Sequence, residues 1–173
     1  MTESTPGADW QLAQINVGRL VAPRGDARVA PFFDALDRVN ALADQSPGFI
    51  WRLQSESGNA TDMQTTSDPL FLVNMSVWAD AESLFEFVYR SAHTPEMARR
   101  REYFERFDTA YQALWWVPAG RVPGVDEGLS RLWRLDRYGP TREAFTFKVR
   151  FPAPGLRGPP TDMKPEPWCL GRA

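Results

Sequence analysis

Leu70-Phe-Leu-Val-Asn-Met-Ser-Val-Trp78 is the strongest strand signal in the chain, because seven of its nine residues are apolar and it contains neither Gly nor Pro. Asp80 follows as a good helix N-cap, and Leu84, Phe87 and Val88 then recur at helical spacing. The chain therefore passes from a strand directly into an amphipathic helix, which indicates a mixed α and β domain.

The segments on either side add elements of the same two kinds. The predicted strands cover residues 10–17, 49–54, 70–78 and 113–117, and the predicted helices run from Pro31, from Ala81 and from Glu96 to Phe107. This order is βαββαβ, so we expect an α+β fold of the ferredoxin-like type, with an antiparallel sheet and helices on one face. A helix over 125–138 and a strand over 144–151 are predicted to extend it.

The domain organisation follows from these elements. We expect residues 1–9 to be disordered, residues 10–151 to form one ferredoxin-like domain, and residues 152–173 to form a proline-rich tail. A chain of 173 residues is long enough to bury a substantial core in one domain.

Composition excludes several classes of protein. Twenty Lys and Arg against 22 Asp and Glu argue against a nucleic-acid binder. No apolar run approaches the roughly 20 residues of a membrane span, and the N-terminus lacks the features of a secretory leader, so we expect a cytoplasmic protein. With Cys169 as its one cysteine and His93 as its one histidine, the chain offers neither an internal disulfide nor a multi-histidine metal site.

Strand parity predicts two unlike sheet faces. On the strongest strand, Phe71, Val73, Met75 and Val77 are expected to face the helices. The other side carries Leu72, Asn74, Ser76 and Trp78, and we expect this face to be left open by the helices. Residues of the other strands that are expected to join it are Trp10, Leu12, Gln14, Asn16, Trp51, Leu53 and one of Trp115 or Trp116, of which Trp116 is the substrate-binding candidate.

This mixed face predicts a homodimer. It is too apolar to stay exposed and too polar for an ordinary core, and two copies packed sheet to sheet would close it around a cavity. The alternative is that the tryptophans are only interface residues, with Asn74 and Ser76 bonding across it.

The stretch from Asn74 to His93, NMSVWADAESLFEFVYRSAH, resembles the dimeric α/β-barrel superfamily and, within it, the antibiotic-biosynthesis-type monooxygenases. The wider chain, including Trp51-Arg-Leu-Gln54, Leu114-Trp-Trp-Val-Pro118 and the residues 139–147, is more similar to a bacterial family of unknown function in that superfamily. The closer resemblance covers roughly residues 10–152.

The monooxygenase resemblance implies a chemistry that needs no cofactor. Members that oxidise anthrone-like aromatics use an Asn and a Trp four residues apart on the third strand, and Asn74 and Trp78 have that spacing. A carboxamide can hold a phenolate or enolate, which can reduce O₂ directly. Trp78 would shape the pocket and donate its indole N–H.

A second branch of the superfamily binds or degrades haem through a histidine together with an Asn and a Trp. His93 lies in a comparable region, although its gap from Trp78 is longer than in haem degraders and Asn16 matches their Asn loosely. Without haem, His93 is a candidate proton acceptor, and the structural alternative is that it caps a helix.

Other candidates are weaker. Tyr89 could donate to a bound oxygen, whereas Arg99-Arg-Arg101 has the pattern of a solvated helix face paired with Glu residues. The predicted function is thus a cofactor-independent oxygenase of a hydrophobic aromatic substrate. The alternatives are a haem protein or a non-catalytic ligand-binding dimer. The catalytic candidates are Asn74, Trp78 and His93, and the substrate-binding candidates are Trp10, Gln14, Asn16, Trp51, Ser76, Tyr89 and Trp116.

Overall fold

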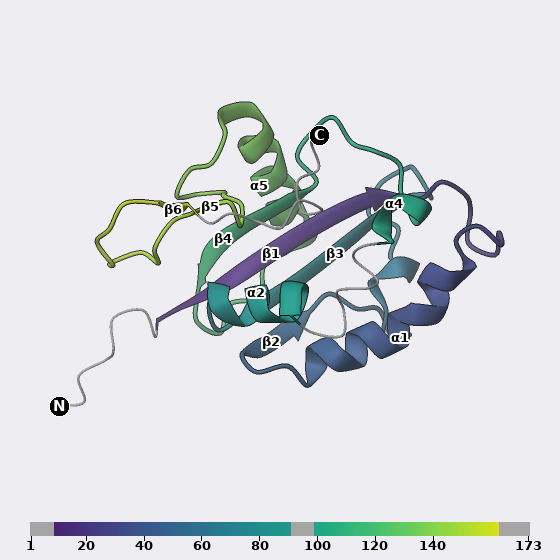
Figure 1. Cartoon of the computed structure of the whole chain (residues 1–173), viewed down its shortest axis with the longest axis horizontal. Coiled ribbons are helices and arrows are strands. Elements are labelled where there is room, and N and C mark those ends of the chain that lie inside the picture. Colours follow the sequence, from purple (N-terminus) through teal and green to yellow (C-terminus); the bar gives the residue numbers. More distant parts are fainter. Residues whose placement is uncertain (1–8, 91–98, 163–173) are drawn as a thin grey trace.

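The computed structural model describes residues 9–90 and 99–162 (Figure 1). The strands of the main sheet are β1 (Trp10–Arg19), β2 (Phe49–Arg52), β3 (Phe71–Trp78) and β4 (Gln112–Pro118). The helices are α1 (Ala30–Asp44), α2 (Ala81–Arg90), α4 (Arg100–Tyr103) and α5 (Val125–Tyr138), with a 3₁₀ turn η1 (Ala60–Asp62) and two short strands, β5 (Val149–Arg150) and β6 (Thr161–Asp162). The predicted disorder of the N-terminus concerns residues that lie almost wholly outside the described ranges.

The main sheet has the order β2-β3-β1-β4, and every pair in it is antiparallel. β1 is paired with β3 on one side and β4 on the other, so that Asn16 lies opposite Asn74 and Ala13 opposite Trp115. With α1 after β1 and α2 after β3, this is the ferredoxin-like α+β arrangement, and the predicted fold class is confirmed.

Local sequence signals set the ends of the helices. Pro31 stands in the first turn of α1, where its missing N–H is not needed. Gly48, after α1, adopts a φ of 77° that disfavours other residues. Asp80 caps α2 as predicted, since its Oδ1 accepts from the Ser83 N–H at 2.7 Å.

The structure reverses the predicted strand faces. Ala13, Ile15 and Val17, with Val73, Met75 and Val77, pack against α5, whereas α1 and α2 cover the face that carries Leu12, Leu72 and Trp78 (Figure 1). The prediction was wrong because it gave the more apolar face to α1 and α2. The additional helix α5 takes that face, so helices of this chain lie on both sides of the sheet.

The tryptophan-bearing face is therefore not open. Trp78 is 0% exposed and packs against Phe49 and Phe87 within the same chain. Trp51 lies on the other face, beside the cluster that α5 covers. The reason given for a sheet-to-sheet dimer thus fails, and a homodimer stays a prediction without an assigned surface.

Gly128 brings α5 close to the sheet. A β-carbon at this position would lie 2.8 Å from Ile15 Cδ1 and 3.1 Å from Met75 Sδ, closer than ordinary side-chain contacts. At one end of α5, Glu127 accepts a hydrogen bond from Trp115 Nε1 at 3.1 Å. Close packing and this bond fix α5 on β1, β3 and β4.

The predicted strand over 144–151 is mostly irregular. Phe145 exchanges backbone hydrogen bonds of 2.8 and 2.9 Å with Leu114 on the outer side of β4. The chain then turns back, because the Val149 N–H donates to Thr146 Oγ1 and the Thr146 N–H to the Val149 carbonyl. Only Val149–Arg150 remains as β5, which pairs with β6 in the proline-rich tail.

The predicted helix over 96–107 is also shorter in its described part. α4 ends at Tyr103, and Phe104 is extended, with φ −121° and ψ 141°. The helix stops because the next residues join the end of β1: Phe104 bridges to Leu20, and the Glu105 N–H donates to the Arg19 carbonyl at 2.8 Å. Within the described ranges, no helix is both long enough and apolar enough to cross a membrane.

Candidate functional site

A pocket of about 430 Å³ lies between α1 and the face of β1 and β3 that α1 covers, with η1 and α4 at its ends. Its size falls within the roughly 300–1,000 Å³ of small-molecule sites. The wall is mostly apolar, with a few polar groups set into it. The lining residues include Asn16, Gly18, Phe32, Asp34, Asn40, Asn59, Thr61, Leu72, Asn74, Arg99, Arg100, Tyr103 and Phe104.

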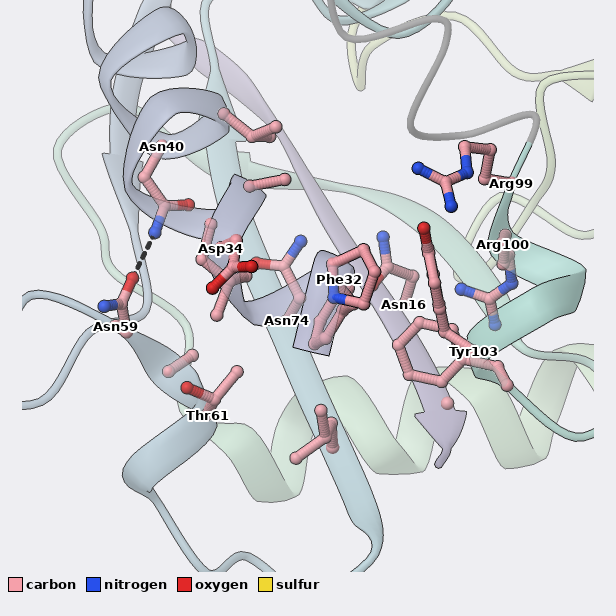
Figure 2. A pocket seen from close by; sticks show the side chains of 18 of the residues that line it. Asn16, Phe32, Asp34, Asn40, Asn59, Thr61, Asn74, Arg99, Arg100 and Tyr103 are labelled. Carbon is pink, nitrogen blue, oxygen red and sulfur yellow. Dashed lines mark hydrogen bonds between the residues drawn. The ribbon is translucent and has the colours of Figure 1, made fainter. Parts of the chain in front are cut away.

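Two carboxamides stand together on the sheet side of this pocket. Asn16 on β1 and Asn74 on β3 are register partners, so their side chains leave the sheet on the same face. Figure 2 shows them between Arg100 and Tyr103 toward one end and Asn40 and Asn59 toward the other. Neither amide side chain hydrogen-bonds to a residue that the structure describes, so both are available to a ligand.

A hydroxyl adds to this polar set. Thr61 Oγ1, in η1, is buried and has no hydrogen-bond partner among the described residues. Asp62, next to it, accepts hydrogen bonds from Ser57 and Arg24, which fix the η1 loop. The bond from Ser57, followed by that from Arg24, lowers the pKa of the Asp62 carboxyl below its ordinary value.

At the η1 end of the pocket two further carboxamides are already paired with other side chains. Asn40 Nδ2 donates to Asn59 Oδ1 at 2.6 Å, and Asn59 Nδ2 donates to Asp37 Oδ1 at 3.1 Å (Figure 2). The unpaired amides Asn16 and Asn74 thus differ from Asn40 and Asn59, whose bonds tie α1 to the loop before η1.

Further along the same sheet face lies a closed hydrogen-bonded group that does not line the pocket. Gln14 Nε2 donates to Ser76 Oγ at 3.1 Å, and Trp78 Nε1 donates to the same oxygen at 2.8 Å. All three side chains are buried. Their polar atoms serve one another, so the indole N–H predicted to face a substrate is used inside the core, and a catalytic role for Trp78 stays a prediction.

The other predicted site residues are spread over the molecule. Trp116 Nε1 donates to the Phe151 carbonyl at 2.9 Å, and Tyr89 packs against Phe85 and Phe147. Trp10 begins β1 opposite Pro118, far along the strand from Asn16. Trp51 is on the α5 side, and His93 lies outside the described residues. Of the ten candidates, the structure brings Asn16 and Asn74 together in the pocket.

Arg100 is a lining residue that the sequence interpretation missed. Arg99 does form the predicted surface pair, with Glu102 at 2.9 Å, but Arg100 turns inward. Arg100 Nη2 donates to the Val17 carbonyl at 2.7 Å, and its Cζ lies over the rings of Phe104 and Tyr111, 5.0 and 4.7 Å from their centroids. Burial lowers the pKa of Arg100 from its ordinary value. The aromatic residues at 103, 104 and 107 were the signal that this side of the segment is inside.

Gly18 shapes the pocket beside Arg100. A β-carbon there would overlap the Phe104 ring, so glycine lets this ring lie flat against β1. Phe104 in turn contacts Phe32 of α1 edge-on, with ring centroids 5.0 Å apart. These aromatic contacts hold α1 against the sheet at the α4 end of the pocket.

No group of three or more metal-ligating side chains occurs within residues 9–90 and 99–162. The alternative of haem binding depends on His93, so it stays untested. The prediction that no cofactor is needed stays a prediction as well.

Comparison with known sequences identifies the family. The sequence model of a domain of unknown function, DUF3291, matches residues 11–160. The chain belongs to the DUF3291 family. This match confirms the predicted membership of a family of unknown function. No curated protein is significantly similar to the sequence.

Two solved structures are similar to this DUF3291 chain over about two thirds of its length. SnoaB, a cofactor-independent oxygenase from Streptomyces nogalater, is 15% identical at a TM-score of 0.43, with 65% of this chain and 95% of SnoaB covered. NE2512, a protein of unknown function from Nitrosomonas europaea, is 13% identical at a TM-score of 0.44, with 68% and 98% covered. At these values the likeness carries no argument about function, so the function of the DUF3291 domain must be argued from its pocket.

Proposed function

We propose that the pocket binds a hydroxylated aromatic molecule and that the protein oxidises it with O₂ without a cofactor. The observation that carries this proposal is the pair of unpartnered carboxamides, Asn16 and Asn74, on the sheet side of a largely apolar pocket. Apolar walls suit the rings of such a substrate, and a few placed polar groups suit its oxygen atoms.

The carboxamides supply N–H donors where negative charge develops. A phenol or an enolisable ketone bound with its oxygen at Asn74 becomes easier to deprotonate, because amide donors favour the anion. Asn16, directly across the strand pair, can hold a second oxygen or share the first. Both residues belong to paired strands, so the positions of their backbones are fixed before the substrate arrives.

The electrons for O₂ come from the substrate itself. In an anthrone-like compound, the two C–H bonds of the reactive carbon are replaced by a C=O bond. One oxygen atom of O₂ enters the product, and the other leaves as water with the two hydrogens. The anion held at Asn74 is the electron donor in the first step. His93 remains the predicted proton acceptor, and Asp34 is the one carboxylate among the described lining residues that could take this role instead.

The test is oxygen consumption by the purified protein with a panel of phenols and anthrone-like compounds, with ¹⁸O₂ incorporation to identify the product. Asn74→Ala should lower kcat/KM about 100-fold, as loss of a donor to a developing oxyanion does. Gln54→Ala is the matched control, because Gln54 is an exposed amide that does not line the pocket. Wild-type turnover by a doubly substituted Asn16→Ala, Asn74→Ala protein would contradict the proposal.

A further inference from the structure

Arg100 carries a charge that the described part of the chain does not balance. Among the described residues, the acidic side chains nearest to it in sequence are used elsewhere, since Glu102 pairs with Arg99 and Glu105 with Arg19. None of the described carboxylates forms an ion pair with Arg100, although other arginines of the molecule have such partners.

The surroundings of Arg100 leave part of its hydrogen-bonding capacity unused. One N–H, on Nη2, is taken by the Val17 carbonyl. The Phe104 and Tyr111 rings contact the guanidinium but accept no ordinary hydrogen bond from it. A guanidinium is built to donate pairs of parallel hydrogen bonds to a carboxylate. A partly buried, unpaired one that lines a pocket is therefore best explained by an anion that arrives with the ligand.

The hydrogen bond from Arg100 to the Val17 carbonyl indicates where that anion would lie. Val17 follows Asn16 on β1, so the guanidinium is anchored to the backbone at the position next to Asn16, in the wall of the pocket. Figure 2 shows Arg100 among the side chains at the end of the pocket beyond Asn16. A ligand with its ring oxygen at the carboxamides can thus place a second, acidic group at Arg100.

We propose that the natural ligand is a hydroxylated aromatic carboxylate whose carboxylate pairs with Arg100. This inference rests on the proposed function for the position of the hydroxyl, and it adds the chemical class of the substrate. A neutral aromatic of the same shape leaves the Arg100 charge unpaired and binds more weakly.

The test compares two ligands of the same shape, one with a carboxylate and one with a neutral carboxamide in its place. Binding of 3-hydroxy-2-naphthoate and of 3-hydroxy-2-naphthamide is measured by titration calorimetry at neutral pH, on the wild type, on Arg100→Met and on Arg101→Gln. Arg101 is the matched control, because it is exposed, does not line the pocket and changes the net charge equally. We expect the acid to bind at least about tenfold more tightly than the amide in the wild type and in Arg101→Gln.

In Arg100→Met this preference should disappear while the amide still binds. Equal affinities in the wild type overturn the inference without any variant, and so does a preference that survives in Arg100→Met. If the acid binds through Arg100 but no compound consumes oxygen, the proposed oxygenase function fails and the carboxylate site stands. If neither ligand binds, the proposed function and the carboxylate site are both overturned.

Discussion

The two faces of the sheet differ in the polarity of their side chains and in how closely a helix packs on them. Toward α5, the residues of β1, β3 and β4 in the core cluster are apolar, from Ala13 to Val117, and α5 packs so closely on them that a β-carbon at Gly128 would lie 2.8 Å from Ile15 Cδ1. Toward α1 and α2, apolar residues alternate with Gln14, Asn16 and Asn74. Near α2 the polar groups are bonded to one another, and near α1 they are not.

This difference shows where stability and function are separated in the molecule. The α5 face is a close-packed core, in which each lost methyl group leaves a cavity. The α1 side of the other face already contains a cavity, and the side chains of Asn16 and Asn74 contribute little to folding because they hydrogen-bond to no described residue. Neighbouring residues on one strand should therefore respond very differently to the same substitution.

Ile15 and Asn16 give the largest contrast, because they are adjacent on β1 and point to opposite faces. Ile15 is fully buried, so Ile15→Ala should lower the free energy of unfolding by about 2–5 kcal/mol. Asn16→Ala should change it by less than about 0.5 kcal/mol. Urea denaturation at neutral pH measures both. Similar losses for the two variants would show that the faces are not distinct in this way.

Gly128 tests how tightly α5 is seated. Gly128→Leu places a side chain where a β-carbon alone already lies 2.8 Å from Ile15 Cδ1, so overpacking should cost about 1–3 kcal/mol of unfolding free energy. Gly124→Leu, at a position with open space around its β-carbon, is the control. A Gly128→Leu protein as stable as the wild type in thermal and urea denaturation would mean that α5 packs loosely.

Glu127 gives the smallest effect and a pH dependence. Its carboxylate accepts from Arg121 at 2.6 Å and from Trp115 Nε1, and the bond from Arg121 is the main cause of its lowered pKa. A carboxyl with a lowered pKa in the folded state stabilises the protein above its unfolded pKa near 4.5, and this contribution is lost as the pH falls through the folded value.

Glu127→Gln should therefore cost about 0.5–1 kcal/mol at about pH 7, and the difference from wild type should shrink toward about pH 3. Urea denaturation across this range measures it. Glu56→Gln, at an exposed carboxyl without a described partner, is the control. A constant difference at all pH values would exclude the ion pair as its cause.

The fold could be predicted because its signals are local. Strand periodicity, Pro31 at the start of a helix and Asp80 as a cap each act within a few residues. Which face of the sheet each helix covers could not be predicted, because α5 and α2 are both amphipathic and the strand sequences do not distinguish between them. The turn within residues 144–151 could not be predicted either. The alternation of this segment predicts a strand, but the bond from the Val149 N–H to Thr146 Oγ1 turns the chain back.

The candidate site was predicted in part for a similar reason. Asn16 and Asn74 were recognisable as amides in strands, where such residues are uncommon. Gln14 and Ser76 carry the same signal, and only the structure shows that they bond to each other and leave the pocket to the other pair. Arg100 could not be told apart from Arg99 and Arg101 in the sequence. Which of the three side chains points into the pocket depends on where α4 ends.

The position of β1 has a consequence for how the chain folds. It is the first of the four strands of the sheet to be synthesised, yet it lies in the middle of the sheet, where it needs β3 and β4 as neighbours. During synthesis, β1 keeps an unpaired edge until residues 112–118 have left the ribosome. The sheet is therefore completed late, through contacts between distant parts of the chain, and such contacts make folding slow. A fragment ending before β4 would present a long apolar strand edge, which is a site for aggregation.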